Sequence, residues 1–280
     1  MKRVLIILLA CWAVGACTCP EQTKMRIATY NLRMDTPHDS INSWSYRKDR
    51  VKALIRYHDF DIIGTQEGFL HQLADICEIP DYTYFGAGRD DGKSAGEHAA
   101  IIYKKDKFAL LDSGNYWLSE TPDKPGLGWD ATCCNRICSW VKFKHKDTGT
   151  EFYFFNVHFD HQGVIARKES GKLMVRKIQE IAGDAHVVCT GDFNSLPETE
   201  QIQALSALLH DSRKAAITPY GPEGTFNSRF ANPITKQRID YIFVSDRFQV
   251  DRYAVLTDNN GQYYPSDHQP VVVDLQIKEK

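Results

Sequence analysis

Residues 190–194 read Thr-Gly-Asp-Phe-Asn and residues 266–270 read Ser-Asp-His-Gln-Pro, and these two segments decide the fold. The first follows the apolar run Val187–Cys189, and the second precedes the apolar run Val271–Val273. Short apolar runs of β-forming residues predict strands. Both segments therefore place polar side chains at the ends of strands.

The spacing within each segment predicts how its side chains are directed. Asp192 and Asn194 are two residues apart, and side chains at that spacing on a strand point the same way, so they are expected to face one cleft. Asp267 and His268 are adjacent and would face opposite ways in a regular strand. A turn must lie there if both serve one site, and the prolines at positions 265 and 270 favour a turn.

The same succession of an apolar strand and a polar group occurs in four more segments. Ile27–Asn31 ends in an amide, Asp61–Glu67 ends in a carboxylate, Phe152–His158 carries Asn156 and His158, and Arg238–Val244 carries Asp240 inside its apolar run. The order and chemistry of these motifs resemble those of the endonuclease/exonuclease/phosphatase superfamily, and the resemblance covers residues 31–268. That group includes pancreatic-type deoxyribonucleases, abasic-site endonucleases and sphingomyelinases. The N-terminus indicates a bacterial lipoprotein member.

The resemblance implies a metal site. Mg²⁺ prefers oxygen ligands and takes one or two protein carboxylates together with water and phosphate oxygens. Glu67 is the first candidate ligand, Asn31 is expected to hold the metal or its water, and Asp267 is expected in the inner or outer shell. Mn²⁺ is an acceptable substitute for Mg²⁺.

The resemblance also assigns the reaction to named side chains. Asp192 and Asn194 are expected to orient the attacking water, and His268, polarised by Asp240, to act as general base or as a charged stabiliser of the transition state. Three donors are expected to contact the phosphate or assist the reaction: Arg136, Asn156 and His158.

Each residue taken singly has a structural alternative. Glu67 is equally explained as a solvated loop acid or a helix cap, and the three asparagines as turn formers. His158 on an apolar strand fits a hydrogen-bonded core histidine, and Arg136 fits a solvated cation at a strand start. Asp240 within an apolar strand needs a partner, because an unpaired buried carboxylate is costly. Only the complete set favours a catalytic site.

Length and pattern predict one mixed α/β domain. The chain has 280 residues, of which 42% are hydrophobic, and contains no Pro/Gly/Ser-rich linker. Helical spacing occurs around residues 51–58, 164–181 and 202–209, between nine strand-like runs. The resemblance implies a four-layer α/β sandwich in which helices flank two packed mixed or antiparallel sheets.

The N-terminus is typical of an export signal. Lys2 and Arg3 precede an apolar run from Val4 to Val14 that is too short to span a bilayer. The sequence that follows ends at Cys17 in the pattern of a bacterial lipobox, so residues 1–16 are expected to form a lipoprotein signal peptide. Residues 17–24 are then a short tether and residues 25–280 a single catalytic domain. We expect an exported protein anchored to a bacterial membrane by lipid on Cys17.

Six cysteines remain beyond Cys11 and Cys17. An exported protein can oxidise some of them. The close spacing of Cys133, Cys134 and Cys138 invites a zinc site, but no paired Cys-x₂-Cys motif or nearby histidine completes it. Buried thiols or one disulfide are the favoured interpretation.

Charge bears on the substrate. The formal net charge is −2, and loss of Lys2 and Arg3 with the signal peptide would remove two positive charges and leave −4. A chain without a basic run lacks the footprint expected of a dedicated nuclease. A phosphorylated small molecule, a phospholipid head group or a nucleotide is therefore favoured over nucleic acid, and a monomer is expected. The alternatives are a nuclease proper and a non-enzymatic ligand-binding lipoprotein on the same scaffold.

Overall fold

A computed structural model describes residues 23–228, 230 and 234–278. The expected signal peptide and nearly all of the expected tether, including Cys17, lie outside the described residues. The first strand begins at Lys24, one residue before the expected domain start. Within the described part of the chain, no helix is long and apolar enough to cross a membrane.

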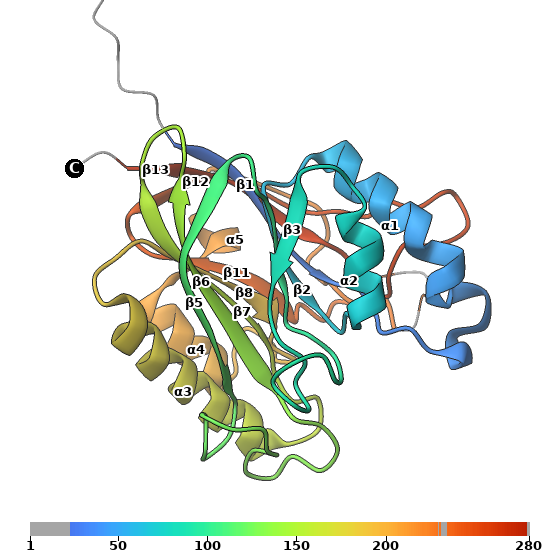
Figure 1. The fold of residues 1–280 in the computed structure, drawn as a ribbon, viewed down its shortest axis with the longest axis horizontal. Coiled ribbons are helices and arrows are strands. Elements are labelled where there is room, and N and C mark those ends of the chain that lie inside the picture. Colours follow the sequence, from blue (N-terminus) through green and yellow to red (C-terminus); the bar gives the residue numbers. More distant parts are fainter. Residues whose placement is uncertain (1–22, 229, 231–233, 279–280) are drawn as a thin grey trace, which may run out of the picture.

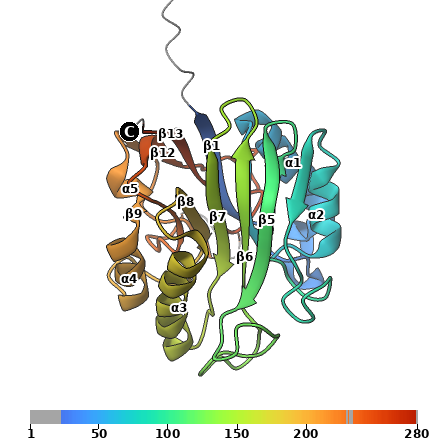
Figure 2. The ribbon, with the colours of Figure 1, turned by 60° about the vertical axis from the view of Figure 1, so that its left-hand side comes forward.

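Two mixed β-sheets form the centre of the molecule, and helices cover their outer faces (Figures 1 and 2). The seven-stranded sheet has the order β10-β12-β13-β1-β2-β4-β3, and the six-stranded sheet has the order β5-β6-β7-β8-β11-β9. This arrangement confirms the predicted four-layer sandwich. The strands are β1 (Lys24–Asn31), β2 (Ile62–Gln66), β3 (Tyr82–Phe85), β4 (Ile101–Lys104), β5 (Phe108–Trp117), β6 (Ile137–His145), β7 (Glu151–His158), β8 (Val187–Asp192), β9 (His210–Asp211), β10 (Thr218–Tyr220), β11 (Asp240–Val244), β12 (Phe248–Val255) and β13 (Val271–Ile277).

Helices lie on both outer faces of this pair of sheets. Helices α1 and α2 cover the seven-stranded sheet, and α3 and α4 cover the six-stranded sheet (Figure 2). The helical elements are η1 (Pro37–Asn42), α1 (Trp44–His58), α2 (Leu70–Cys77), α3 (Val164–Ala182), α4 (Glu200–Leu208) and α5 (Ser212–Ala215).

Alternation along the strands explains why the layers form. In β1, Ile27 packs between the two sheets, whereas its neighbours Ala28 and Tyr30 pack toward α1. A strand whose two faces are both buried must be apolar on both, which is why these strands read as continuous apolar runs. The largest core lies between the sheets and contains several aromatic rings, among them Phe143, Phe152 and Phe154.

The topology brings the polar segments to one edge of both sheets. Strands β1 and β2 run parallel, and so do β7 and β8, so their carboxyl ends meet at the same edge. Strands β11 and β13 run antiparallel to β8 and β1, so their amino ends arrive there too. The register is specific: Asp192 lies level with both His158 and Asp240.

Candidate active site

A cavity of about 520 Å³ opens at this edge of the sheets. It is lined by seven of the ten predicted site residues: Glu67, Arg136, His158, Asp192, Asn194, Asp267 and His268. Two more, Asn31 and Asp240, are buried directly behind the lining residues and hydrogen-bond to them. The chain bends at residues 265–267, just before His268, which forms an isolated antiparallel bridge with Phe226, and this bend lets Asp267 and His268 both line the cavity.

Glu67 and Asp267 both line the cavity, and Arg33 lies near each of them, with Nη1 3.9 Å from Glu67 Oε2 and Nε 4.0 Å from Asp267 Oδ2. Glu67 follows β2 with a left-handed backbone (φ 62°), and its Oε1 accepts a hydrogen bond from Asn31 Nδ2 at 3.0 Å. Asp267 is buried, and its Oδ1 has no hydrogen-bond partner among the described residues. Burial raises the pKa of Asp267, and the Glu67 carboxylate raises it further, against the lowering effect of His268.

This side of the cavity can hold a divalent cation. A buried carboxylate oxygen without a donor, next to a second carboxylate and an amide, suits a hard cation that takes oxygen ligands. Ligand atoms of Glu67, His158 and Asp192 also lie within 4.8 Å of one another. The carboxylates of Glu67 and Asp267 are therefore chemically suited to a divalent cation, and Asn31, whose Nδ2 donates to Glu67 and whose Oδ1 accepts from the Arg33 backbone N–H, holds Glu67 in place.

Asp240 and His268 form a buried pair on the opposite side. His268 Nδ1 lies 3.1 and 2.9 Å from the two carboxylate oxygens of Asp240, and Thr225 Oγ1 donates to Asp240 Oδ2 at 2.6 Å. Burial disfavours the charged imidazole, but the Asp240 and Asp192 carboxylates raise the pKa of His268 well above its ordinary value. The imidazole is thus held in one orientation with its Nε2 directed toward Asp192, 3.8 Å away.

Asp192 connects the two sides. Its Oδ2 accepts from Asn31 Nδ2 at 3.0 Å and lies 3.6 Å from His158 Nε2, and its Oδ1 accepts from the backbone N–H of Asn194 at 2.9 Å. Burial, followed by the nearby Asp240 carboxylate, raises the pKa of Asp192 to about 7. Asn194 itself adopts a left-handed backbone (φ 46°) just beyond β8 and lines the cavity.

The predicted role of Asn156 is wrong. Its side chain is fully buried between the two sheets, below the cavity, and does not line it. The amide donates to the carbonyl oxygens of Thr65 and Ala100 and accepts from Gln66 Nε2 and Thr190 Oγ1. Every hydrogen-bonding position of Asn156 is occupied by the protein, so this residue joins the sheets and cannot donate to a phosphate.

The sequence prediction missed several cavity residues, among them the charged residues Arg33, Arg89 and Glu97. Glu97 Oε2 accepts from Arg89 Nη1 at 2.6 Å and lies 3.8 Å from His158 Nδ1. Burial and the Glu67 charge raise the pKa of Glu97 to about 7. A signal was present in the sequence, because Glu97 lies four residues before the start of β4, as Asp267 lies four residues before the start of β13.

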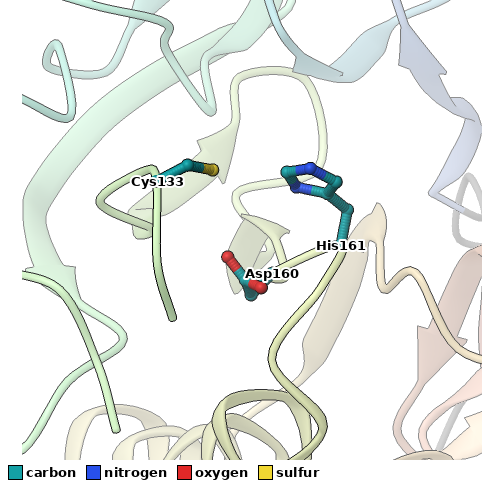
Figure 3. Close-up of side chains that lie close together, drawn as sticks. All are labelled: Cys133, Asp160 and His161. Carbon is teal, nitrogen blue, oxygen red and sulfur yellow. The ribbon is translucent and has the colours of Figure 1, made fainter. Parts of the chain in front are cut away.

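A second polar cluster lies beside the cavity and holds Arg136. Figure 3 shows Cys133, Asp160 and His161 around a common space. Cys133 forms a disulfide with Cys134, and His161 Nδ1 accepts from Arg136 Nη2 at 2.8 Å. The Cys133 sulfur and the His161 Nδ1 atom, which a zinc site here would require as ligands, are therefore already engaged.

Asp160 combines two roles in this cluster. Its Oδ1 accepts from the backbone N–H groups of Gln162 and Gly163 and so shapes the start of α3. Its Oδ2 lies 3.5 Å from Arg136 Nε. Arg136 is 5% exposed and lines the cavity, so it is not a solvated cation. Among the other cysteines that the structure describes, Cys77, Cys138 and Cys189 are free thiols.

Comparison with known proteins agrees with this geometry. A profile of the Endonuclease/Exonuclease/phosphatase family matches residues 28–268. An endonuclease/exonuclease/phosphatase family protein from Bacteroides thetaiotaomicron is 45% identical, with a TM-score of 0.88 over 93% of this chain and 100% of that chain. A mannosyl-6-phosphatase from the same organism is 47% identical, with a TM-score of 0.85 over 90% of this chain and 99% of that chain. The human nocturnin catalytic domain, 18% identical with a TM-score of 0.73 over 92% of this chain and 98% of that chain, shares the fold.

The chain belongs to the endonuclease/exonuclease/phosphatase family. It is accordingly an enzyme of the phosphoesterase class, a hydrolase of ester bonds. Membership of this family favours an enzyme over a non-enzymatic binding protein on the same scaffold.

Proposed function

We propose that this enzyme hydrolyses a phosphate ester of a small molecule, with Mg²⁺ or Mn²⁺ bound at Glu67, Asn31 and Asp267. One observation carries the proposal. Asn31 Nδ2 donates at 3.0 Å both to Glu67 Oε1 and to Asp192 Oδ2, so a single buried amide links the cation side of the cavity to the side that handles water. When bound, the cation would neutralise charge on phosphate oxygens and favour loss of the ester oxygen.

The protein's own side chains supply the rest of the chemistry. Asp192 and Asn194 would hold a water in line with the ester bond, and His268, oriented and kept charged by Asp240, would stabilise the negative charge that develops on the phosphate oxygens. The water oxygen forms a bond to phosphorus while the phosphorus–oxygen ester bond breaks. The proton that the water loses would pass to Asp192, and the leaving alcohol retains the bridging oxygen and takes a proton from solvent. Arg136 and His158 would hold the non-bridging oxygens.

A phosphorylated sugar is the first candidate substrate. The mannosyl-6-phosphatase from Bacteroides thetaiotaomicron is 47% identical to this chain over almost its full length. The slightly acidic overall charge also favours a small molecule over a nucleic acid backbone. A phospholipid head group or a nucleotide fits the same chemistry. The alternative is a nuclease proper, which would be indicated by preferential hydrolysis of nucleic acid.

We extend the proposal to the protein's location. The lipobox pattern ending at Cys17 supports an exported lipoprotein anchored by acyl chains at a bacterial membrane, and we propose that it acts as a monomer. Such an anchor would leave the catalytic domain free to meet soluble substrates.

The decisive experiment is a substrate screen with and without metal. Purified protein is assayed against sugar 6-phosphates, nucleotides, phospholipids and single-stranded and double-stranded DNA, after EDTA treatment and after readdition of Mg²⁺ or Mn²⁺. We expect a small phosphate ester to be hydrolysed, activity to be lost in EDTA, and activity to return with either cation. Full activity in chelator would refute the metal site, and preference for DNA would replace the substrate proposal by the nuclease alternative.

A further inference from the structure

Two guanidinium groups, those of Arg89 and Arg136, lie on one wall of the active-site cavity with unsatisfied donors. Their side chains are only 13% and 5% exposed. Arg89 Nε and both Nε and Nη1 of Arg136 are buried without a hydrogen-bond partner among the described residues. Buried N–H groups of a charged side chain are costly unless a partner satisfies them. The free N–H donors of this wall therefore suit a ligand with several hydrogen-bond acceptor oxygens.

The neighbouring acids leave these donors without hydrogen bonds, although Asp90 Oδ1 lies 4.0 Å from Arg89 Nε. Glu97 accepts from Arg89 Nη1, and Asp160 gives one oxygen to backbone N–H groups while the other lies 3.5 Å from Arg136 Nε outside hydrogen-bonding geometry. His161 accepts from Arg136 through Nδ1. Burial lowers the pKa of Arg136, and the adjacent Arg89 charge lowers it further. Two like charges held together in a buried site favour binding of an anion between them.

This wall borders the place where the phosphate must react. His158 lies 3.6 Å from Asp192 on one side and 3.8 Å from Glu97 on the other. Burial depresses the pKa of His158 well below its ordinary value, and the largest charge effects on it come from Arg136 and then Arg89. A phosphate held beside His158 and attacked by water at Asp192 would thus lie within the field of both guanidinium groups.

We propose that Arg89 joins Arg136 in binding the terminal, doubly charged phosphate of a phosphomonoester, and that Arg89 selects monoesters over diesters. This inference rests on the proposed phosphate-ester hydrolysis and specifies its substrate class. A phosphomonoester carries close to two negative charges at neutral pH and three terminal oxygens. A diester carries one negative charge and two such oxygens, and its second substituent would occupy the position of an oxygen that faces the arginines.

The test compares two substrates that release the same p-nitrophenolate: p-nitrophenyl phosphate and methyl p-nitrophenyl phosphate. The variants are Arg89→Gln, Arg89→Lys and, as a matched control, Arg56→Gln at an exposed position of α1. We expect Arg89→Gln to lower kcat/KM for the monoester by at least about tenfold, the size of a lost charged hydrogen bond, and for the diester by less than about threefold. Arg89→Lys should lie between, and Arg56→Gln should match the wild type. Equal losses on both substrates would overturn the inference while leaving phosphate-ester hydrolysis intact.

A binding measurement keeps the inference testable if neither ester is turned over. Inorganic phosphate is titrated by calorimetry into the Mg²⁺-loaded wild type and into each variant. Arg89→Gln should weaken phosphate binding by about tenfold, and Arg56→Gln should not change it. Unchanged affinity in Arg89→Gln would refute the role of Arg89 whatever the true reaction is. If loss of the Arg89–Glu97 pair impairs folding, the double variant Arg89→Gln/Glu97→Gln removes both charges and serves in its place.

Discussion

Replacement of His268 by alanine separates a catalytic pair from a structural one. His268 is 5% exposed and Asp240 is 1% exposed, and the two are joined at 2.9 and 3.1 Å. If the pair only stabilised the fold, its loss would change stability and leave turnover per folded molecule unchanged. If His268 takes part in the reaction, turnover must fall even in molecules that remain folded.

The structure sets the expected magnitudes. Removing the imidazole leaves Asp240 buried with Thr225 Oγ1 as its remaining side-chain donor, and breaking such a pair costs about 3 kcal/mol of unfolding free energy. A loss of that size lowers the Tm of a domain this large by roughly 5–10 °C. Loss of a charged group that stabilises the transition state lowers kcat by at least about 100-fold.

The assay measures kcat on the best substrate from the screen and Tm by thermal unfolding, for His268→Ala and for His268→Ala/Asp240→Asn. The second change removes the stranded charge, so the double variant should regain most of the lost stability while kcat stays at the low value. Near-normal kcat in either variant, with only the Tm reduced, would refute the catalytic assignment. Recovery of kcat together with Tm in the double variant would have the same consequence.

Three further predictions concern the pair, the sheet junction and the anchor. Burial lowers the pKa of His268, but the carboxylates of Asp240 and Asp192 raise it well above its ordinary value, so the folding stability gained from the protonated imidazole is lost only as the pH rises past that raised pKa. Asp240→Asn should therefore shift the alkaline fall of kcat to lower pH, and an unmoved pH–rate profile would contradict this. Asn156→Ala should destabilise the fold by about 3 kcal/mol, because several buried groups lose partners at about 1–3 kcal/mol each, yet leave kcat within about threefold; a large kcat loss at unchanged Tm would restore its phosphate role. Cys17→Ser in a bacterial host should release the protein from the membrane fraction, and unchanged fractionation would exclude the lipobox.

Several of the predicted strands are buried on both faces. Continuous apolar runs such as those of β7 and β8 leave few alternatives, and the structure has strands at both positions. The edge strand β3 was also predicted, from its aromatic residues, whereas β5, β9, β10 and β12, at or next to sheet edges, were missed. β5 has an exposed, partly polar middle with Leu110 and Leu111 turned to solvent, so its sequence lacks a clear apolar period. β12 alternates buried and exposed residues over most of its length, and this pattern could have been recognised despite a register shift near Arg252.

The candidate site was predictable at positions where a charged or ionisable side chain lies in or beside an apolar strand. Asp192, Asp240, Asp267 and His268 are costly groups next to apolar strands, and burial of such groups requires partners, which the cavity provides. Asn156 is likewise a polar residue in an apolar strand, and the sequence does not show whether its side chain points into the cavity or between the two sheets. Only the packing of β7 against β2 decided that its amide joins the sheets, whereas His158, two residues further along the same strand, reaches the cavity.

The sequence by itself determined most of the apolar strand segments, the acids and imidazoles at their ends, and the family to which they belong. It could do so because apolar runs and the polar residues that follow them are local properties of the chain. The tertiary structure alone decided that Arg89 and Glu97, from the connection before β4, meet Arg136 and His158 at one wall of the cavity. Such a meeting depends on contacts between strands of different sheets, whose relative placement follows from packing of the whole core and is not encoded in any local pattern.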